Sequence, residues 1–253
     1  MTSPPTTGPP AADPVFHPAF HPVLHGEIRG DRPLIVAAVE EEAARLDDRF
    51  PVLITGMGKV NAATALAVTL SEGGPPREIV NLGTAGALKE GFHGLQVISR
   101  VLQHDLDTAL LHTLSGRVYG APLTVVQAPG PTLATGDTFV TDPAVRDRLA
   151  EEADLVDMEG YAVVAVARRL GVPVRLVKYV SDRADESART TWPDAVDHAA
   201  GILAGWVDTH LPAPASADGL PLRPRTSVTF APHRSERRSG QAPHRPLPAP
   251  QPS

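Results

Sequence analysis

Short apolar runs alternate with longer Ala-rich stretches between residues 34 and 210. The runs are of strand length and nearly continuous, which is typical of strands buried on both faces of a parallel sheet. The stretches between them have the length and propensity of helices. The alternation predicts a single α/β domain with a sizeable core.

The predicted elements can be given in chain order. They are a strand at 33–39, a few helical turns at 40–50, a strand at 51–56, a helix at 59–74, and strands at 78–88, 95–102 and 122–128. A turn with a strand end at 134–140, a helix from 142 to about 152, a short strand at 154–158, a helix at 160–170, a strand at 174–180 and a helix at 193–211 follow. Ligands of such folds bind where the strands end. Polar or Gly-rich segments follow five strands, at 40–42, 56–59, 83–86, 158–159 and 181–182, so we expect the site at that edge.

Both ends of the chain differ from this body. Residues 1–30 repeat Pro with scattered His, and residues 212–253 are mostly Pro, Ala, Ser and Arg. Such segments bury too little apolar surface to offset the entropy of ordering them. We therefore expect disorder at 1–30 and 212–253 around a domain at 31–211.

Charge and composition exclude several classes of function. The stretch after Leu211 carries six arginines against two acidic residues, a net +4, and since the whole chain carries −6, the rest carries −10. An acidic body does not favour nucleic-acid binding. No apolar run approaches the roughly 20 residues of a membrane helix, so no membrane contact is expected. The absence of cysteine excludes disulfides and thiolate chemistry, and it fits a cytoplasmic protein.

Single motifs carry little information about metals or cofactors. The Gly-rich turns at 56–59 and 83–86 match neither the Walker A phosphate-binding loop of nucleoside triphosphatases nor the dinucleotide fingerprint. The segment 104–107, His-Asp-Leu-Asp, has no second His cluster to complete a coordination sphere. His17, His21 and His25 are spaced by four, but the intervening prolines prevent a common helix. We expect no metal and no organic cofactor.

In combination the motifs are specific. Their order is AVEEEA (38–43), GMGKVNAA (56–63), VNLGTAGAL (80–88), QHDLD (103–107), TGDTFV (135–140), VDMEG (156–160) and VSDRAD (180–185). This order resembles the nucleoside phosphorylase superfamily, and most of all its hydrolytic branch, the 5′-methylthioadenosine/S-adenosylhomocysteine nucleosidases. The resemblance covers about residues 33–210. It implies a three-layer α-β-α fold around a mixed, mostly parallel twisted sheet, and a homodimer.

The resemblance also implies catalytic roles. Asp182 matches the general acid that protonates or hydrogen-bonds N7 of the leaving purine, and Ser181 matches the residue that orients it. Glu42 matches the base that deprotonates the attacking water. Thr84 and Lys178 stand where the family has a Ser and an Arg that fix this water, and Lys lacks the planar fork of Arg.

The remaining matches concern substrate binding. Glu159 matches the acceptor of the ribose hydroxyls, and Met158 the residue that packs on the sugar. Phe139 and the backbone of Val140 match the aromatic shelf and the edge that receive the base.

The end of the site that holds the 5′ substituent is less defined. Met57 and Val39 predict an apolar patch there, which favours a thioether. The stretches 42–58 and 107–135, which carry recognition of that substituent in relatives, are short in this chain. The sequence therefore leaves the 5′ substituent open.

The nucleophile separates hydrolysis from phosphorolysis. Phosphorylases place Arg before the Gly-Ser/Thr-x-Gly turn, whereas this chain has Asn81-Leu82 there and three glutamates, 40–42, after the first strand. Carboxylates repel phosphate and suit water. The sequence thus predicts hydrolysis of a purine nucleoside, with adenine expected as the base. Phosphate-dependent phosphorolysis, futalosine hydrolysis and nucleoside binding without catalysis remain as alternatives.

Overall fold

The computed structural model describes residues 22–186, 188–211 and 227–229. Its elements are β1 (Val23–His25), β2 (Leu34–Ala37), α1 (Glu40–Ala43), β3 (Val52–Ile54), α2 (Lys59–Gly73), β4 (Ile79–Ala87), β5 (Gly94–Val97), β6 (Arg100–Gln103), α3 (Thr108–Ser115), β7 (Leu123–Thr124), β8 (Thr132–Thr135), α4 (Pro143–Leu149), β9 (Leu155–Asp157), α5 (Gly160–Arg169), β10 (Val174–Asp182), α6 (Ala188–His210) and β11 (Ser227–Thr229). None of the helices among these residues has the length and apolarity that a bilayer crossing requires.

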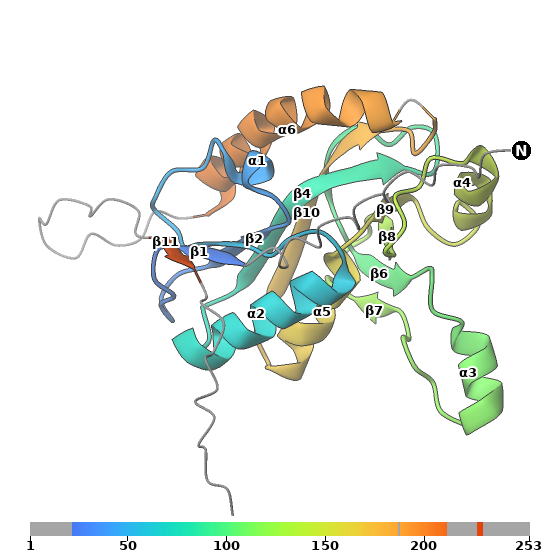
Figure 1. The fold of residues 1–253 in the computed structure, drawn as a ribbon, viewed down its shortest axis with the longest axis horizontal. Helices are drawn as coiled ribbons and strands as arrows, with labels where there is room; N and C mark the ends of the chain where they lie inside the picture. The colour runs from blue at the N-terminus through green and yellow to red at the C-terminus, as the bar shows by residue number, and fades with distance from the viewer. Residues whose placement is uncertain (1–21, 187, 212–226, 230–253) are drawn as a thin grey trace, which may run out of the picture.

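All the described strands belong to one mixed sheet (Figure 1). Its main path runs β11-β1-β3-β2-β4-β9-β8-β6-β7, and β10 pairs with both β4 and β5. The pairings of β2 with β3 and β4, of β4 with β10, and of β8 with β6 and β9 are parallel. The remaining pairings, including β4 with β9, are antiparallel. The predicted α/β class with a mixed sheet is confirmed.

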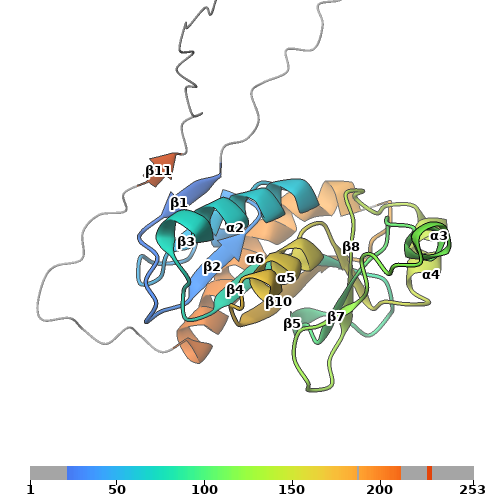
Figure 2. The ribbon, with the colours of Figure 1, turned by 90° about the horizontal axis from the view of Figure 1, so that it is seen from below.

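Helices cover both faces of the sheet, which makes three layers (Figures 1 and 2). The buried strand β2 has apolar side chains on both faces of the sheet. Ile35 and Ala37 pack in the core that contains α6, whereas Leu34 and Val36 pack in the core that contains α2 and α5. A strand buried on two faces needs apolar side chains at every position, which explains the continuous runs in the sequence.

Three predicted elements differ clearly from the structure. The expected strand at 122–128 is reduced to β7, Leu123–Thr124. The expected strand at 95–102 is two strands, because β5 pairs with β10 whereas β6 pairs with β8. The last helix begins at Ala188 rather than at residue 193. A helix boundary at Pro193 follows the preference of Pro for the first turn, but here the helix continues through it.

The prediction of disorder at 1–30 and 212–253 does not hold for residues 22–30 or for β11. Strand β1 pairs with β3 on one side and with β11 on the other. Leu24 packs against the core under α2, and Ile28 is buried there. A strand of three residues, as β1 and β11 each are, is too short to stand out as an apolar run. The rest of both segments, with His17 and His21, lies outside the described residues.

Candidate functional site

A cavity of about 330 Å³ lies where the strands β2, β4, β9 and β10 end. Its walls come from the segments that directly follow β2, β8 and β9, from the ends of β4, β9 and β10, and from α1 and α6. Every residue of the predicted site lines this cavity except Lys178. Parallel strands bring their carboxyl ends to one edge, which is why segments far apart in the chain meet here.

Glu42 lies at this edge on the short helix α1, with its side chain buried. Its Oε1 accepts hydrogen bonds from the backbone N of Thr84 at 2.8 Å and from Thr84 Oγ1 at 3.0 Å. Its Oε2 accepts from the backbone N of Ala38 at 3.1 Å. A Cβ on Gly83 would lie 3.0 Å from Glu42 Oε1, so glycine there lets the carboxylate approach the strand. These three donors fix the position of the carboxylate.

Trp192 extends this network from the first turns of α6. Its Nε1 donates to Thr84 Oγ1 at 3.1 Å, and its side chain lines the cavity. Indole N–H only donates, so the Thr84 oxygen is the acceptor of this bond and the Thr84 proton is directed to Glu42. Trp192 was not among the predicted site residues, and it lies one residue before the start of the predicted helix.

Lys178 lies behind the cavity wall, and its side chain is fully buried. Its Nζ forms an ion pair with Asp157 Oδ2 at 2.9 Å. Burial alone would lower the pKa of Lys178, but the carboxylates of Asp157, Glu159 and Glu42 outweigh it and raise that pKa above its ordinary value. A Cβ on Gly83 would meet Lys178 Nζ at 3.2 Å, so this ammonium also lies near Glu42. Lys178 therefore offsets the negative charge of these buried carboxylates although it does not line the cavity.

Asp157 is held as firmly as its partner. Its Oδ1 accepts from Thr135 Oγ1 at 2.7 Å, and its Oδ2 accepts from the backbone N of Gly160 at 2.9 Å. Gly160 leaves no room for a side chain, since a Cβ there would lie 2.7 Å from Leu133 Cδ2. Asp157 therefore anchors the start of α5 and the position of Lys178.

Glu159 immediately precedes α5 and is buried. Its Oε1 accepts from the backbone N of Gly58 at 2.7 Å. Burial, reinforced by repulsion from Asp157 and partly offset by Lys178, raises the pKa of Glu159 to about 8. At neutral pH this carboxyl is therefore mainly protonated in the unliganded site.

The segment Gln103-His104-Asp105 supports the neighbouring loop. Asp105 pairs with Lys59, and its Oδ2 accepts from the backbone N of Asp137 at 2.9 Å. Partial burial would raise the pKa of Asp105, but its bonds to Lys59 and Asp137 lower it. Among the described residues no group of three or more His, Asp or Glu is placed to hold a metal. This segment fixes the start of α2, and with it Gly58.

Asp182 ends β10 after an irregularity in the register with β4, which places it opposite Gly86. Its Oδ2 accepts from Ser181 Oγ at 2.7 Å, and its Oδ1 accepts from the backbone N of Ala184 at 2.8 Å. A Cβ on Gly86 would lie 3.0 Å from Asp182 Oδ1, so a glycine is needed there. Such irregularities at strand ends redirect side chains, here toward the cavity.

The apolar part of the wall is formed by Val39, Met57, Phe139, Val140 and Met158. Val140 is buried, whereas Phe139 and Met57 are 39% and 46% exposed. A flat ring or a thioether would cover these exposed side chains. The cavity thus combines an apolar surface with four carboxyl groups, those of Glu42, Asp157, Glu159 and Asp182.

The model of the phosphorylase superfamily matches residues 10–208, most of the chain. The chain belongs to the phosphorylase superfamily. A curated relative, the 5′-methylthioadenosine/S-adenosylhomocysteine nucleosidase of Bacillus thuringiensis (strain Al Hakam), is 32% identical over 195 residues, which is 65% of this chain and 82% of the relative. Relatives of the same name in Bacillus cereus strains AH187 and AH820 match to the same extent.

Solved structures of the superfamily share the fold. The 5′-methylthioadenosine/S-adenosylhomocysteine nucleosidase of Helicobacter pylori, in complex with a pyrrolidine inhibitor, has a TM-score of 0.62 at 20% identity and covers 72% of this chain and 98% of its own. Futalosine hydrolase of Helicobacter pylori has a TM-score of 0.62 at 19% identity, over 71% and 97%. The S-adenosylhomocysteine nucleosidase of Streptococcus pyogenes, bound to 5-methylthiotubericidin, has 0.60 at 23%, over 72% and 96%.

Proposed function

We propose that this member of the phosphorylase superfamily hydrolyses the N-ribosidic bond of a purine nucleoside, with adenine as the base and a 5′-thioether such as 5′-methylthioadenosine or S-adenosylhomocysteine as substrate. Its products are the free base and the ribose derivative. The curated relatives at 32% identity carry the name of this activity. The observation on which the proposal depends is that Glu42 and Asp182 line one cavity of about 330 Å³, which is within the range of small-ligand sites.

The two carboxyl groups supply the two proton transfers. Glu42 takes a proton from a water molecule while the water oxygen bonds to the anomeric carbon. As the carbon–nitrogen bond breaks, its electron pair moves into the purine, and Asp182 gives a proton or hydrogen bond to N7. The donors on Glu42 from Ala38 and Thr84 orient its carboxylate, and Ser181 orients Asp182. A positioned acid or base of this kind contributes about 10²–10⁴ in rate.

The charge of the wall supports water as the nucleophile. The described residues that line the cavity include the four carboxyl groups named above and neither Lys nor Arg. Lys178, the nearest buried cation, is paired with Asp157. The buried carboxylate of Glu42 would repel a phosphate dianion, and no cation among the described lining residues would compensate it. This arrangement favours hydrolysis over phosphorolysis.

Each of the remaining groups of the cavity is assigned to one part of the substrate. Glu159 binds the ribose 2′- and 3′-hydroxyls, and Met158 packs on the sugar. Phe139 stacks on the base, and the backbone of Val140 contacts its edge. Met57 and Val39 receive the 5′ substituent. In this assignment Lys178 acts on the water only indirectly, because it does not line the cavity.

We also propose that the protein is a homodimer and is cytoplasmic. The helix α3 buries none of its residues, and Leu110, Leu114, Val118 and Tyr119 in and after it are 45–73% exposed. Apolar surface of this kind is typical of a protein interface. The location follows from the cysteine-free composition. Sedimentation at micromolar concentration tests the dimer, and a single monomeric species would contradict it.

Base-release kinetics test the function. The panel is 5′-methylthioadenosine, S-adenosylhomocysteine, adenosine, inosine and futalosine, each with and without phosphate. We expect turnover of the two thioethers at a rate that phosphate does not change. Acceleration by phosphate would show phosphorolysis, and preference for futalosine would assign that hydrolase. Tight nucleoside binding without base release would identify a binding protein.

A further inference from the structure

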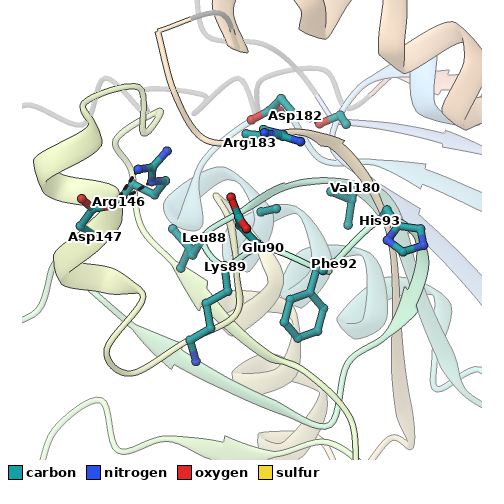
Figure 3. A pocket seen from close by; sticks show the side chains of 13 residues that line it. Leu88, Lys89, Glu90, Phe92, His93, Arg146, Asp147, Val180, Asp182 and Arg183 are labelled. Carbon is teal, nitrogen blue, oxygen red and sulfur yellow. Dashed lines mark hydrogen bonds and ion pairs between the residues drawn. The ribbon is translucent and has the colours of Figure 1, made fainter.

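A second cavity, of about 740 Å³, adjoins the nucleoside cavity (Figure 3). Its walls are formed by the end of β4 with the turn to residue 93, by Arg146 and Asp147 of α4, and by residues 180–183 at the end of β10. Ser181 and Asp182 line both cavities. The proposed acid therefore stands at the border between them.

The second cavity lies at the base end of the site, because its walls continue the segments assigned to the base. Arg183 follows Asp182, the residue assigned to N7 of the base. Helix α4 begins three residues after Val140. By contrast, no residue assigned to the sugar or to the 5′ substituent lines it.

Purine chemistry tells which part of a substrate would face this space. The 6-substituent and N7 lie on the same edge of the ring system. A carboxyl group that reaches N7 therefore stands beside the 6-substituent. Any bulky arm on that position must extend past Asp182, which is where the second cavity begins.

The walls favour an uncharged arm. Leu88 is buried and Phe92 is half-buried, which gives apolar contact surface. Two cations that line the cavity form ion pairs with acidic residues: Lys89 with Asp154 at 2.8 Å, and Arg146 with Asp147 at 2.7 Å.

Glu90 and Arg183 offset one another in charge, and neither makes an ion pair with another described residue. Figure 3 shows Glu90 pointing into the middle of the space, below Arg183. No uncompensated cluster of one sign remains to select an anionic or cationic arm.

We propose that the site accepts adenine nucleosides that carry an alkyl or arylmethyl group on N6, with the group held in the second cavity against Phe92 and Leu88. This inference depends on the proposed nucleosidase function, since it extends the substrate class of the same site. An adenine pocket closed behind N7 would reject such substrates, because overpacking in a rigid wall is costly.

The test compares 5′-methylthioadenosine with its N6-benzyl derivative in the base-release assay on the full chain. We expect the benzyl derivative to keep kcat/KM within about tenfold of the parent, as for a group that gains apolar contact in an open pocket. Hydrolysis of the parent with no measurable hydrolysis of the benzyl derivative would overturn the inference and leave the proposed function in place. Failure of both substrates would overturn the two proposals together.

A filling variant identifies the cavity as the location. Glu90→Trp places a large ring in the second cavity at an exposed position, so it should fold, and we expect it to lower kcat/KM for the benzyl substrate by at least about tenfold while the parent is unaffected. Glu72→Trp, an identical change at an exposed position on α2, is the matched control and should change neither rate. Equal rates of Glu90→Trp and Glu72→Trp on the benzyl substrate would show that the arm lies elsewhere and would overturn the inference.

Discussion

At the scale of single residues, the two proposed catalytic carboxyl groups differ in their surroundings. Glu42 is buried and held by three donors, two of them from the backbone. Asp182 is half-buried, and its partners are the adjacent Ser181 and the N–H of Ala184. A fixed carboxylate suits a base that must aim one water, whereas the more open Asp182 is free to exchange its bonds for one to the substrate.

Removing either proton transfer should slow the chemistry without abolishing binding. For Glu42→Gln and Asp182→Asn we expect kcat to fall by about 10²–10⁴, because each amide keeps the shape of the side chain but cannot transfer the proton. Base release measures kcat, and equilibrium binding of a nucleoside measures the affinity, which should be retained. A variant with the wild-type kcat would lose its assigned role.

Glu159 predicts an unusual dependence of stability on pH. Its pKa rises on folding from 4.5 to about 8, so between these values the folded state binds more protons than the unfolded state. The free energy of unfolding therefore falls as the pH rises from about 5 to 8. Glu159→Gln cannot ionise, and we expect it to flatten the decline in Tm over this range by a few degrees. The same slope in both proteins would contradict the assigned pKa.

At the scale of elements, a hydrogen bond between two side chains joins α6 and β4 at the site. Trp192 of α6 donates to Thr84 of β4, and Thr84 donates to Glu42. The described part of α6, which packs beside α1, thereby contributes to the position of the proposed base. The indole N–H is the atom that matters for this connection.

Trp192→Phe tests the connection because it keeps an aromatic ring and removes the N–H. A neutral hydrogen bond is worth about 0.5–1.5 kcal/mol, so we expect kcat to fall about two- to tenfold with little change in KM. Thr84→Val should cause a loss at least as large, since it removes both bonds of the hydroxyl. A rise in KM with unchanged kcat would show that Trp192 serves only to contact the substrate.

The sequence predicts most of this architecture because buried strands are continuous apolar runs, and the polar residues of the site directly follow those runs. Continuous apolar runs identify β2, β3, β4 and β10. The split between β5 and β6 depends on which distant strand each one meets, and no local signal records that choice. Trp192 was missed for a related reason, since its role depends on contact with Thr84, 108 residues away.

At the scale of the whole molecule, the candidate site at the strand ends is separate from the lateral edge of the sheet, which β11 forms. The described residues that line the nucleoside cavity lie between Ala38 and Trp192, whereas the edge strand β11 pairs with β1. Strand β11 can therefore affect stability without contacting the described residues that line the cavity.

Deletion of residues 213–253 separates these two contributions. We expect kcat and KM for base release to stay at the values of the full chain, because the deletion removes none of the described residues that line the cavity. We expect lower solubility, because the loss of β11 leaves the outer hydrogen-bonding groups of β1 unpaired and open to other chains. Deletion of residues 231–253 keeps β11 and is the matched control, which should behave as the full chain in both respects. If the longer deletion alone abolishes activity, β11 supports the fold of the site through β1 and β3. The candidate site would then depend on β11, contrary to the prediction.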